Sequence, residues 1–178
     1  MYFCLSCLTG KESQAVENVQ KYLEENIAED FSVWFPQKIN RDKKKGVYTE
    51  HKFPLFPGYL FIYWGGEDEI NFPFHEIRKI PQIVKILKYE NNSHALLGSD
   101  YNFAHWIHEN DGEIKPSRVF CKEGSRLRII SGPLVGMDAN VIKVDKHHKR
   151  ITLRFTVGDK TSDISFSVDF INTSTSVL

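Results

Sequence analysis

The sequence KFPLFPGYLFIYW at residues 52–64 predicts a proline-kinked approach followed by an apolar β-strand. Pro54 and Pro57 exclude a helix because each fixes φ and biases the preceding residue toward extended geometry. Gly58 allows a backbone conformation that other residues rarely adopt, and the aromatic and β-branched run 59–63 favours a pleated sheet. Because neighbouring strand residues face opposite sides, this run needs a cover on both faces. One cover is the core, and the other is either a helix of this chain or the surface of a partner.

Residues 1–112 alternate between strand and helix patterns. Strands are expected at 2–8, 31–35, 59–63 and 83–89, and helices at 13–25, 74–80 and 99–108. Ser13 is expected to cap the first helix, and Ser99 or Asp100 the last. The first helix has a core stripe of Ala15, Val16, Val19 and Leu23 and a solvated face of Lys11, Glu12, Glu17, Lys21 and Glu24. The order predicts an α+β fold in which helices cover one side of an antiparallel sheet.

A basic hairpin precedes the apolar strand. Its tip, residues 40–46, carries Arg41, Lys43, Lys44 and Lys45 and turns at Gly46. Four cations on a hairpin tip are costly to bury and well placed to contact DNA. The alternative is that they only keep the tip soluble.

The segment after residue 112 has no helical period. Asn110, Asp111, Gly112 and Pro116 mark a boundary, so we expect domains at 1–112 and 121–178 joined by a linker at 113–120. Short β-type runs at 126–130, 139–145, 151–156 and 164–171 predict a small all-β barrel that closes its own edges. The loop Gly132, Pro133 and Gly136 is expected to be defined by its backbone.

Charge is distributed unevenly along a chain whose net charge is zero. Residues 1–112 carry 12 Lys and Arg against 16 Asp and Glu, a net of −4, and residues 113–178 carry 11 against 7, a net of +4. The C-terminal part is therefore expected to meet a polyanion. The candidate nucleic-acid contacts there are Arg126, Arg128, Lys143, Lys146, His147, His148, Lys149, Arg150 and Arg154. The alternative is a solvated turn that keeps a small domain soluble.

The sequence contains no catalytic or metal-binding motif. HExxH, GxSxG, the Walker loop and GxGxxG are all absent, so we expect no enzyme, no metal and no cofactor. His105 and His108 are interpreted as surface or packed residues of a helix edge. Cys4 and Cys7 point to opposite faces of a strand and are interpreted as inert core residues, as is Cys121. With no membrane-length apolar run and no signal peptide, we expect a cytoplasmic monomer.

Two motifs resemble those of a known family. Phe56-Pro57-Gly58-Tyr59 after a basic hairpin is similar to the signature strand of the NusG transcription factors, and residues 124–136, GSRLRIISGPLVG, resemble the KOW motif. The resemblance implies an NGN domain that binds RNA polymerase, followed by a KOW barrel. It places the polymerase contact on Phe56 and Tyr59, to which we add the neighbours Phe53 and Leu55. Aromatic residues of this kind are frequent hot spots of interfaces.

One departure from the family pattern bears on function. Where the barrel of a general NusG presents an aromatic residue and Gly-Arg for the ribosomal protein and Rho, this chain has Thr156-Val157-Gly158-Asp159-Lys160. It therefore resembles specialised paralogues, such as RfaH and LoaP, that antiterminate particular operons. Their recruitment signals, a leader RNA hairpin or exposed non-template DNA, stay open. The alternatives are a general factor that couples polymerase to the ribosome or Rho, and a KOW-based RNA- or ribosome-binding module.

Overall fold

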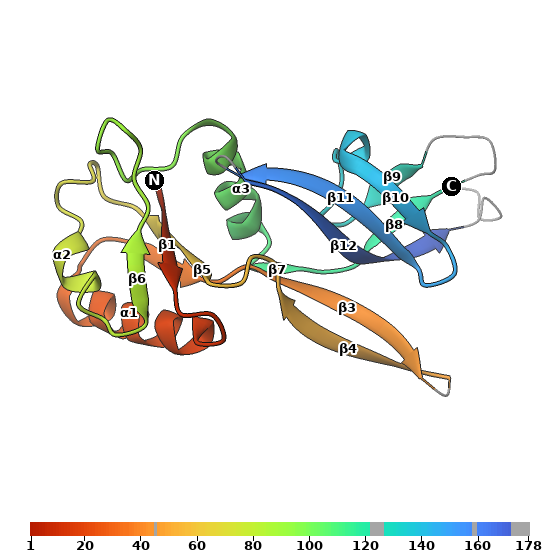
Figure 1. The fold of residues 1–178 in the computed structure, drawn as a ribbon, viewed down its shortest axis with the longest axis horizontal. Coiled ribbons are helices and arrows are strands. Elements are labelled where there is room, and N and C mark those ends of the chain that lie inside the picture. Colours follow the sequence, from red (N-terminus) through yellow and green to blue (C-terminus); the bar gives the residue numbers. More distant parts are fainter. Residues whose placement is uncertain (45, 122–126, 158–159, 172–178) are drawn as a thin grey trace. The chain divides into compact units, whose positions relative to one another are not determined.

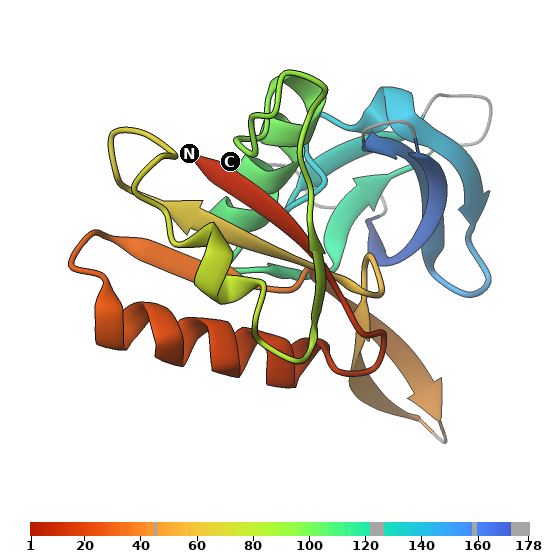
Figure 2. The ribbon, with the colours of Figure 1, turned by 60° about the vertical axis from the view of Figure 1, so that its left-hand side comes forward.

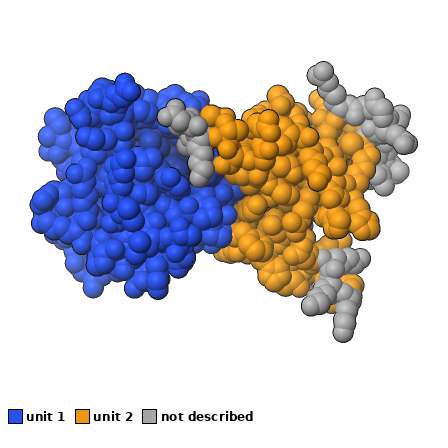
Figure 3. All heavy atoms as spheres, in the orientation of Figure 1, with its two compact units in different colours: residues 1–37, 54–112 blue, residues 38–53, 113–178 orange. Residues whose placement is uncertain are grey.

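The computed structural model describes residues 1–44, 46–121, 127–157 and 160–171 of the chain (Figure 1). It separates into two compact units, residues 1–37 with 54–112 and residues 38–53 with 113–178 (Figure 3). The second unit thus contains the basic hairpin. With this division the charge asymmetry widens, because the first unit carries 6 Lys and Arg against 14 Asp and Glu and the second 17 against 9.

The first unit is an α+β fold. Its elements in chain order are β1 (Tyr2–Cys7), α1 (Glu12–Asn26), β2 (Phe31–Trp34), β5 (Tyr59–Trp64), α2 (Phe74–Ile77), β6 (Ile83–Ile86) and α3 (Gly98–Glu109). The strands pair antiparallel in the order β2-β5-β1-β6. The apolar strand identified from the sequence, β5, is therefore central and pairs along its length with β1.

Helices cover both faces of this sheet, so the expectation of helices on one side is wrong. On one face, Phe3 and Leu5 of β1 share a buried cluster with Val19 and Leu23 of α1. On the other face, the ring of Phe61 in β5 lies 5.8 Å from that of Phe103 in α3. Figure 2 shows α1 and α3 on opposite sides of the sheet. The second cover that the apolar strand requires is thus a helix of the chain itself.

The helix starts differ from the expected caps. α1 begins at Glu12 after Lys11, and α3 begins at Gly98 after Leu97, and neither preceding residue makes a side-chain cap hydrogen bond. The second helix is only one turn long, ending at Ile77. Glu12, assigned from the helical period to the solvated face, is instead buried at 5% exposure. The hydrogen-bond partner of its carboxylate lies outside α1, at Gly58.

The second unit consists of a hairpin and a β domain. The hairpin strands β3 (Gln37–Lys44) and β4 (Val47–Pro54) form a three-stranded sheet with β7 (Glu113–Ile114), in the order β4-β3-β7. The β domain contains β8 (Ser117–Phe120), β9 (Arg128–Ser131), the 3-10 turn Asp138–Asn140, β10 (Val141–Asp145), β11 (Arg150–Val157) and β12 (Lys160–Ile171). Its strand order is β10-β11-β12-β8-β9, with β12 and β8 parallel and the other pairs antiparallel.

The segment 113–120, expected as a linker, contains the strands β7 and β8, which are separated by Lys115 and Pro116. Each is too short for a periodic pattern to identify it, and each depends on a distant partner. Val119 of β8, for example, pairs with Phe170 of β12 and with Ile129 of β9. The four strands expected further on are confirmed with shifted ends, because pairing rather than side-chain type decides where a strand stops.

Within the described residues, none of the helices combines the length and the apolar character that a membrane crossing requires.

Candidate functional site

Residues 56–59 form a tight turn between β4 and β5. The Tyr59 N–H donates to the Phe56 carbonyl at 3.3 Å, Pro57 occupies the second position, and Gly58 has a φ of +80° at the third. Proline followed by a positive-φ glycine is typical of a type II turn. A side chain at Gly58 would lie 2.9 Å from the Thr9 hydroxyl oxygen, so both the conformation and the space require glycine here.

Buried hydrogen bonds hold this turn on the first unit. The Gly58 N–H donates to the Glu12 carboxylate at 2.8 Å, and the Gly58 carbonyl accepts from the Cys7 N–H at 2.8 Å. The Leu55 N–H donates to the Pro36 carbonyl at 2.7 Å. Glu12 is buried because its carboxylate satisfies a backbone group of this turn. The turn is therefore a rigid platform for the two aromatic residues beside it.

The four residues expected to contact a partner differ in exposure. Phe56 and Tyr59 are half-buried, and the Phe56 ring meets Phe103 of α3 edge to face at 5.1 Å. Leu55 is only 5% exposed, so it packs within the unit and presents almost no surface to a partner. Phe53 is 43% exposed but belongs to the hairpin in the second unit. Within the first unit, Phe56 and Tyr59 are left as the candidate contact surface.

A cluster of imidazoles and aromatic rings lies between α3 and the sheet. The Tyr2 hydroxyl is 3.0 Å from Nδ1 of both His105 and His108, and the His108 ring stacks on Trp34 at 4.8 Å. Burial raises the pKa of Tyr2 to about 12. Burial, followed by the nearby His105, lowers the pKa of His108. His108 is thus a partly buried, packed residue, whereas the His105 side chain is 48% exposed and lies at the surface, so each of the two interpretations of the sequence applies to one histidine.

Because of this lowered pKa, the first unit is expected to lose stability in mild acid. His108 binds a proton less readily in the folded state than in the unfolded state, whose pKa is near 6.5. Stability is therefore full above this pH and decreases as the pH falls below it. The imidazole of His108 is surrounded by Tyr2, Tyr63, Trp34 and His105. Its pKa is raised by the nearby carboxylates of Asp111, Asp30 and Glu109, but these only partly offset the lowering by burial.

Urea denaturation at pH values between about 5 and 8 measures this loss. The substitution His108→Gln is expected to flatten the decline on the acid side relative to the unsubstituted chain. Equal slopes for the two proteins would contradict a role for His108.

In the second unit, the basic turn is the connection between β10 and β11, residues 145–150. Asp145 organises it by accepting the His148 N–H at 2.9 Å and contacting His148 Nδ1 at 2.9 Å. These two hydrogen bonds lower the pKa of Asp145. Lys149 closes the turn at a φ of +53°. The turn thus has a defined conformation that presents Lys149 and Arg150 beside the hairpin.

Several of the expected nucleic-acid contacts are ion-paired or hydrogen-bonded within the chain. Arg150 Nη2 lies 2.9 Å from Asp42 Oδ1, and Lys149 Nζ lies 2.9 Å from the Tyr48 hydroxyl. Arg41 pairs with Glu50 at 2.7 Å and with Asp169 at 3.0 Å. Arg154 makes two bonds to Asp163, at 2.7 and 2.8 Å. Pairing was not foreseeable from the sequence, since most partners lie more than one hundred positions away.

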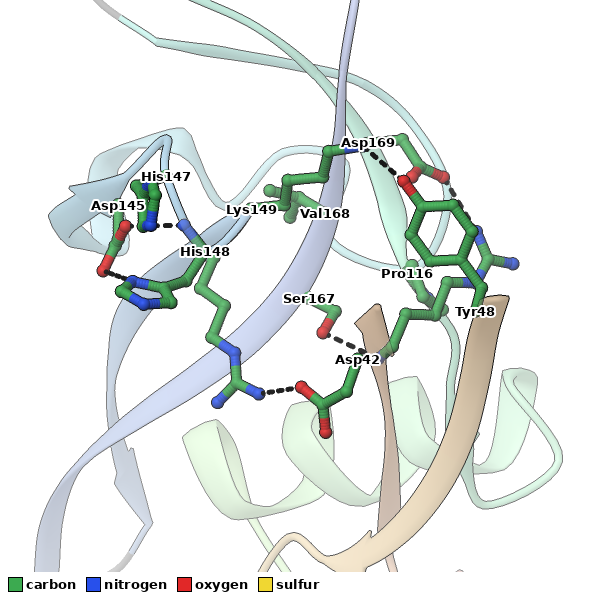
Figure 4. Close-up of a pocket in the computed structure, with 12 residues that line it drawn as sticks. Asp42, Tyr48, Pro116, Asp145, His147, His148, Lys149, Ser167, Val168 and Asp169 are labelled. Atoms are coloured by element: carbon green, nitrogen blue, oxygen red, sulfur yellow. Dashed lines mark hydrogen bonds and ion pairs between the residues drawn. The ribbon is translucent and has the colours of Figure 1, made fainter. Parts of the chain in front are cut away.

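A cavity of about 640 Å³ is lined by residues of the hairpin, the basic turn and β12 (Figure 4). Its lining brings together three expected cations, Arg41, Lys149 and Arg150, with the imidazoles His147 and His148. The carboxylates Asp42, Asp145 and Asp169 face the same space, so its formal charge is balanced. The aromatic ring of Tyr48 and the buried hydroxyl of Ser167 complete the polar lining.

Other expected contacts lie elsewhere. Arg154 is four residues beyond Arg150 on β11, about 13 Å along a strand. Arg128 lies on β9, at the opposite end of the sheet order from β10. Lys143 is exposed on β10, and Lys146 is exposed within the turn. Arg126 and Lys45, together with the side chains of Lys43 and Lys44, fall outside the described residues.

The loop expected to be backbone-defined follows β9. Gly132 has a φ of +100°, and a side chain there would lie 2.8 Å from the Ser117 hydroxyl oxygen. That oxygen accepts the Leu134 N–H at 3.0 Å across the partly buried Pro133. Gly136 also has a positive φ, of +85°, but a side chain placed there would have no atom of another residue within 4 Å, apart from its chain neighbours. The two glycines therefore have different roles, close packing at the first and backbone conformation at the second.

Groups suited to metal or thiol chemistry are not apparent in the described part of the chain. There, no set of three or more His, Cys, Asp or Glu side chains is arranged to hold a metal ion. Cys4 and Cys7 are buried, and burial raises the pKa of both thiols, which makes them poor nucleophiles.

Comparison with known proteins gives a consistent result. The sequence profile of a family described as "Transcription termination factor nusG" matches residues 1–101. The "Transcription termination/antitermination protein NusG" of Helicobacter pylori strain J99 is 25% identical over 172 residues, covering 92% of each chain. That of Thermus thermophilus is 25% identical over 166 residues, covering 88% of this chain and 89% of the relative. The structure titled "Domain interaction in Thermotoga maritima NusG" has the same fold, with a TM-score of 0.54, 16% identity, and coverage of 93% and 92%.

Proposed function

This chain belongs to the NusG family of transcription elongation and termination factors, and from that premise we propose that it binds RNA polymerase and promotes antitermination of particular operons. The polymerase contact is formed by Phe56 and Tyr59, and the recruitment signal is a leader RNA hairpin bound by the β domain. Members of this family are transcription factors without enzymatic activity, in line with a chain that acts by binding alone.

The single observation that carries the polymerase contact is the turn at residues 56–59. Two half-buried aromatic residues flank a Pro-Gly turn that is tied to α1 and β1 by buried hydrogen bonds. A rigid aromatic pair loses little conformational entropy when it binds, and such residues contribute strongly to interfaces. Leu55, which precedes the turn, is buried within the unit, so we do not propose Leu55 as a polymerase contact.

Charge supports the nucleic-acid part of the proposal. The second unit, which combines the hairpin with the β domain, carries a net charge of +8 from 17 Lys and Arg against 9 Asp and Glu. A concentration of positive charge on one unit favours phosphate contacts. In the β domain, Arg and His side chains beside a well-defined turn suit the single-stranded loops through which RNA is read. The hairpin tip with Lys43, Lys44 and Lys45 is the proposed contact to DNA.

The sequence at residues 156–160 favours a specialised factor over a general one. Thr156-Val157-Gly158-Asp159-Lys160 stands where a factor that binds the ribosomal protein or Rho is expected to have an aromatic residue followed by Gly-Arg, and of these residues Gly158 and Asp159 lie outside the described part of the chain. We therefore propose residues 1–112 as the polymerase-binding NGN domain and residues 121–178 as a KOW domain directed to RNA. The second candidate function is general coupling of polymerase to the ribosome or Rho.

Transcription in vitro tests the proposal. The full chain is added to RNA polymerase of the same organism. The templates carry the leader of the operon that lies next to the gene of this chain, placed ahead of an intrinsic terminator. Readthrough is expected to rise with the natural leader and to stay at its basal level with a scrambled loop. Equal effects on both leaders would favour the general factor, and no effect on either would contradict the proposal.

A further inference from the structure

The hairpin β3–β4 contacts the basic turn of the β domain through Lys149 and Arg150, two of the residues expected to contact nucleic acid. Asp42 on β3 accepts from Arg150 at 2.9 Å. Tyr48 on β4 accepts from Lys149 at 2.9 Å, and the ammonium also lies 5.3 Å from the centre of the ring. A carboxylate and a phenol oxygen thus take the positions at which phosphate oxygens would bind these cations.

Further contacts join the hairpin to β12. The Arg41 N–H donates to the Ser167 hydroxyl at 2.9 Å, and the Arg41 guanidinium pairs with Asp169 at 3.0 Å. Lys38 donates to the Ser165 carbonyl at 2.9 Å. The hairpin therefore offers both a carboxylate to the basic turn and cations to the neighbouring strand, which fixes its register on the β domain.

The ion pairs among these contacts are accessible to solvent, whereas the Ser167 hydroxyl that accepts from the Arg41 N–H is buried. The side chains of Arg150 and Asp42 are 33% and 53% exposed, and those of Arg41 and Asp169 are 38% and 45% exposed. Exposed ion pairs contribute little each and weaken with salt. A polyanion that reaches the basic turn can therefore displace the distal part of the hairpin, with Asp42 and Tyr48, while Ile39 and Asn40 at its base stay buried.

We propose that Asp42 and Tyr48 form a hairpin latch, an internal competitor that occupies Lys149 and Arg150 until the phosphates of an RNA replace it. The inference rests on the proposed function, because it specifies how the RNA-binding turn is regulated. Binding of RNA and release of the distal part of the hairpin are then coupled, and the coupling is reciprocal. The latch lowers the apparent affinity for RNA, which equals the affinity of the open turn multiplied by the fraction of molecules in which the turn is open.

Substitutions in the hairpin test the latch without altering the cations of the turn. The double substitution Asp42→Asn with Tyr48→Phe, in the full chain, removes one carboxylate charge and one hydroxyl acceptor. The probe is an oligouridylate of about 20 nucleotides, whose binding requires only phosphate contacts. Since exposed pairs are weak, the affinity is expected to rise by a modest factor, about 3- to 10-fold at low salt, and the gain shrinks as salt increases.

Glu113→Gln is the matched control. It also removes one carboxylate charge from the same three-stranded sheet, but the partner of Glu113 is Lys52 and not a residue of the basic turn. Its affinity for the oligouridylate is expected to stay within about twofold of the unsubstituted chain, as for surface changes in general. An equal gain for both variants would mean that net charge alone is responsible and would overturn the latch.

A second measurement follows the hairpin itself. The substitution Thr49→Cys introduces a site for a spin label on β4, and Cys121→Ser removes the accessible natural cysteine, since Cys4 and Cys7 are buried. The label is expected to broaden the amide signals of Ser167 and Val168 in the free chain. Oligouridylate is expected to reduce this broadening. Absence of broadening in the free chain, or broadening unchanged by bound oligouridylate, would overturn the latch.

The two proposals fail in different ways. If the natural leader and a scrambled one bind equally, specific recognition fails, while the oligouridylate gain and the loss of broadening still support the latch. If leader recognition holds but the double substitution leaves the affinity for oligouridylate unchanged or lower, the latch is wrong and the proposed function stands.

Discussion

Replacing Phe56 and Tyr59 together by alanine is expected to lower the affinity of the full chain for RNA polymerase by about 30- to 100-fold, the effect of losing about two to three kcal/mol at an interface hot spot. The turn at Pro57 and Gly58 keeps its hydrogen bonds to the backbone of β1 and to Glu12, so the substitutions remove surface rather than the platform. Binding to immobilised core polymerase, measured by interferometry, gives the ratio of dissociation constants.

Loss of the edge contact between Phe56 and Phe103 also costs some stability, so folding needs a control. Tyr22→Ala serves this purpose. Tyr22 is likewise a half-buried aromatic residue, but it lies on α1, which covers the opposite face of the sheet. Its variant is expected to bind polymerase as the unsubstituted chain does. A double variant that has native circular dichroism and undiminished binding would refute the contact.

Glu12→Ala is expected to destabilise the first unit by about 2 to 3 kcal/mol, because it leaves the buried Gly58 N–H without an acceptor. The carboxylate is only 5% exposed and accepts this N–H at 2.8 Å. The aromatic residues beside the turn lose part of their support at the same time. Urea denaturation at pH 7 followed by tryptophan fluorescence measures the change in the free energy of unfolding.

Two companion substitutions separate the hydrogen bond from other effects. Glu12→Gln keeps an oxygen acceptor of similar shape and is expected to cost less than half as much as Glu12→Ala. Glu17→Ala removes an exposed carboxylate from the same helix and is expected to change stability by at most about 0.5 kcal/mol. If Glu12→Ala and Glu17→Ala cost the same, the buried hydrogen bond has no special importance.

The sequence alone predicted the features that depend on neighbouring residues. Alternating and helical periods located β1, α1, β2, β5 and α3, and the α+β fold followed by an all-β domain is confirmed. The Pro57-Gly58 pair predicted a special backbone conformation, observed as a φ of +80°. The two motifs at residues 56–59 and 124–136 indicated the family, which the profile over residues 1–101 confirms. Each of these signals is contained in a short segment of the sequence.

Other features required the tertiary structure. The helical period placed Glu12 in solvent, but Gly58, 46 positions away, makes it a buried acceptor. Charge counting presented Lys149 and Arg150 as open cations, but Asp42 and Tyr48, more than one hundred positions earlier, satisfy them. β7 and β8 are strands only because distant segments pair with them. The sequence by itself determined the local conformations of this chain and the family to which it belongs. The tertiary structure decided which polar groups meet, because the energy of a buried hydrogen bond or an ion pair depends on distances that folding alone establishes.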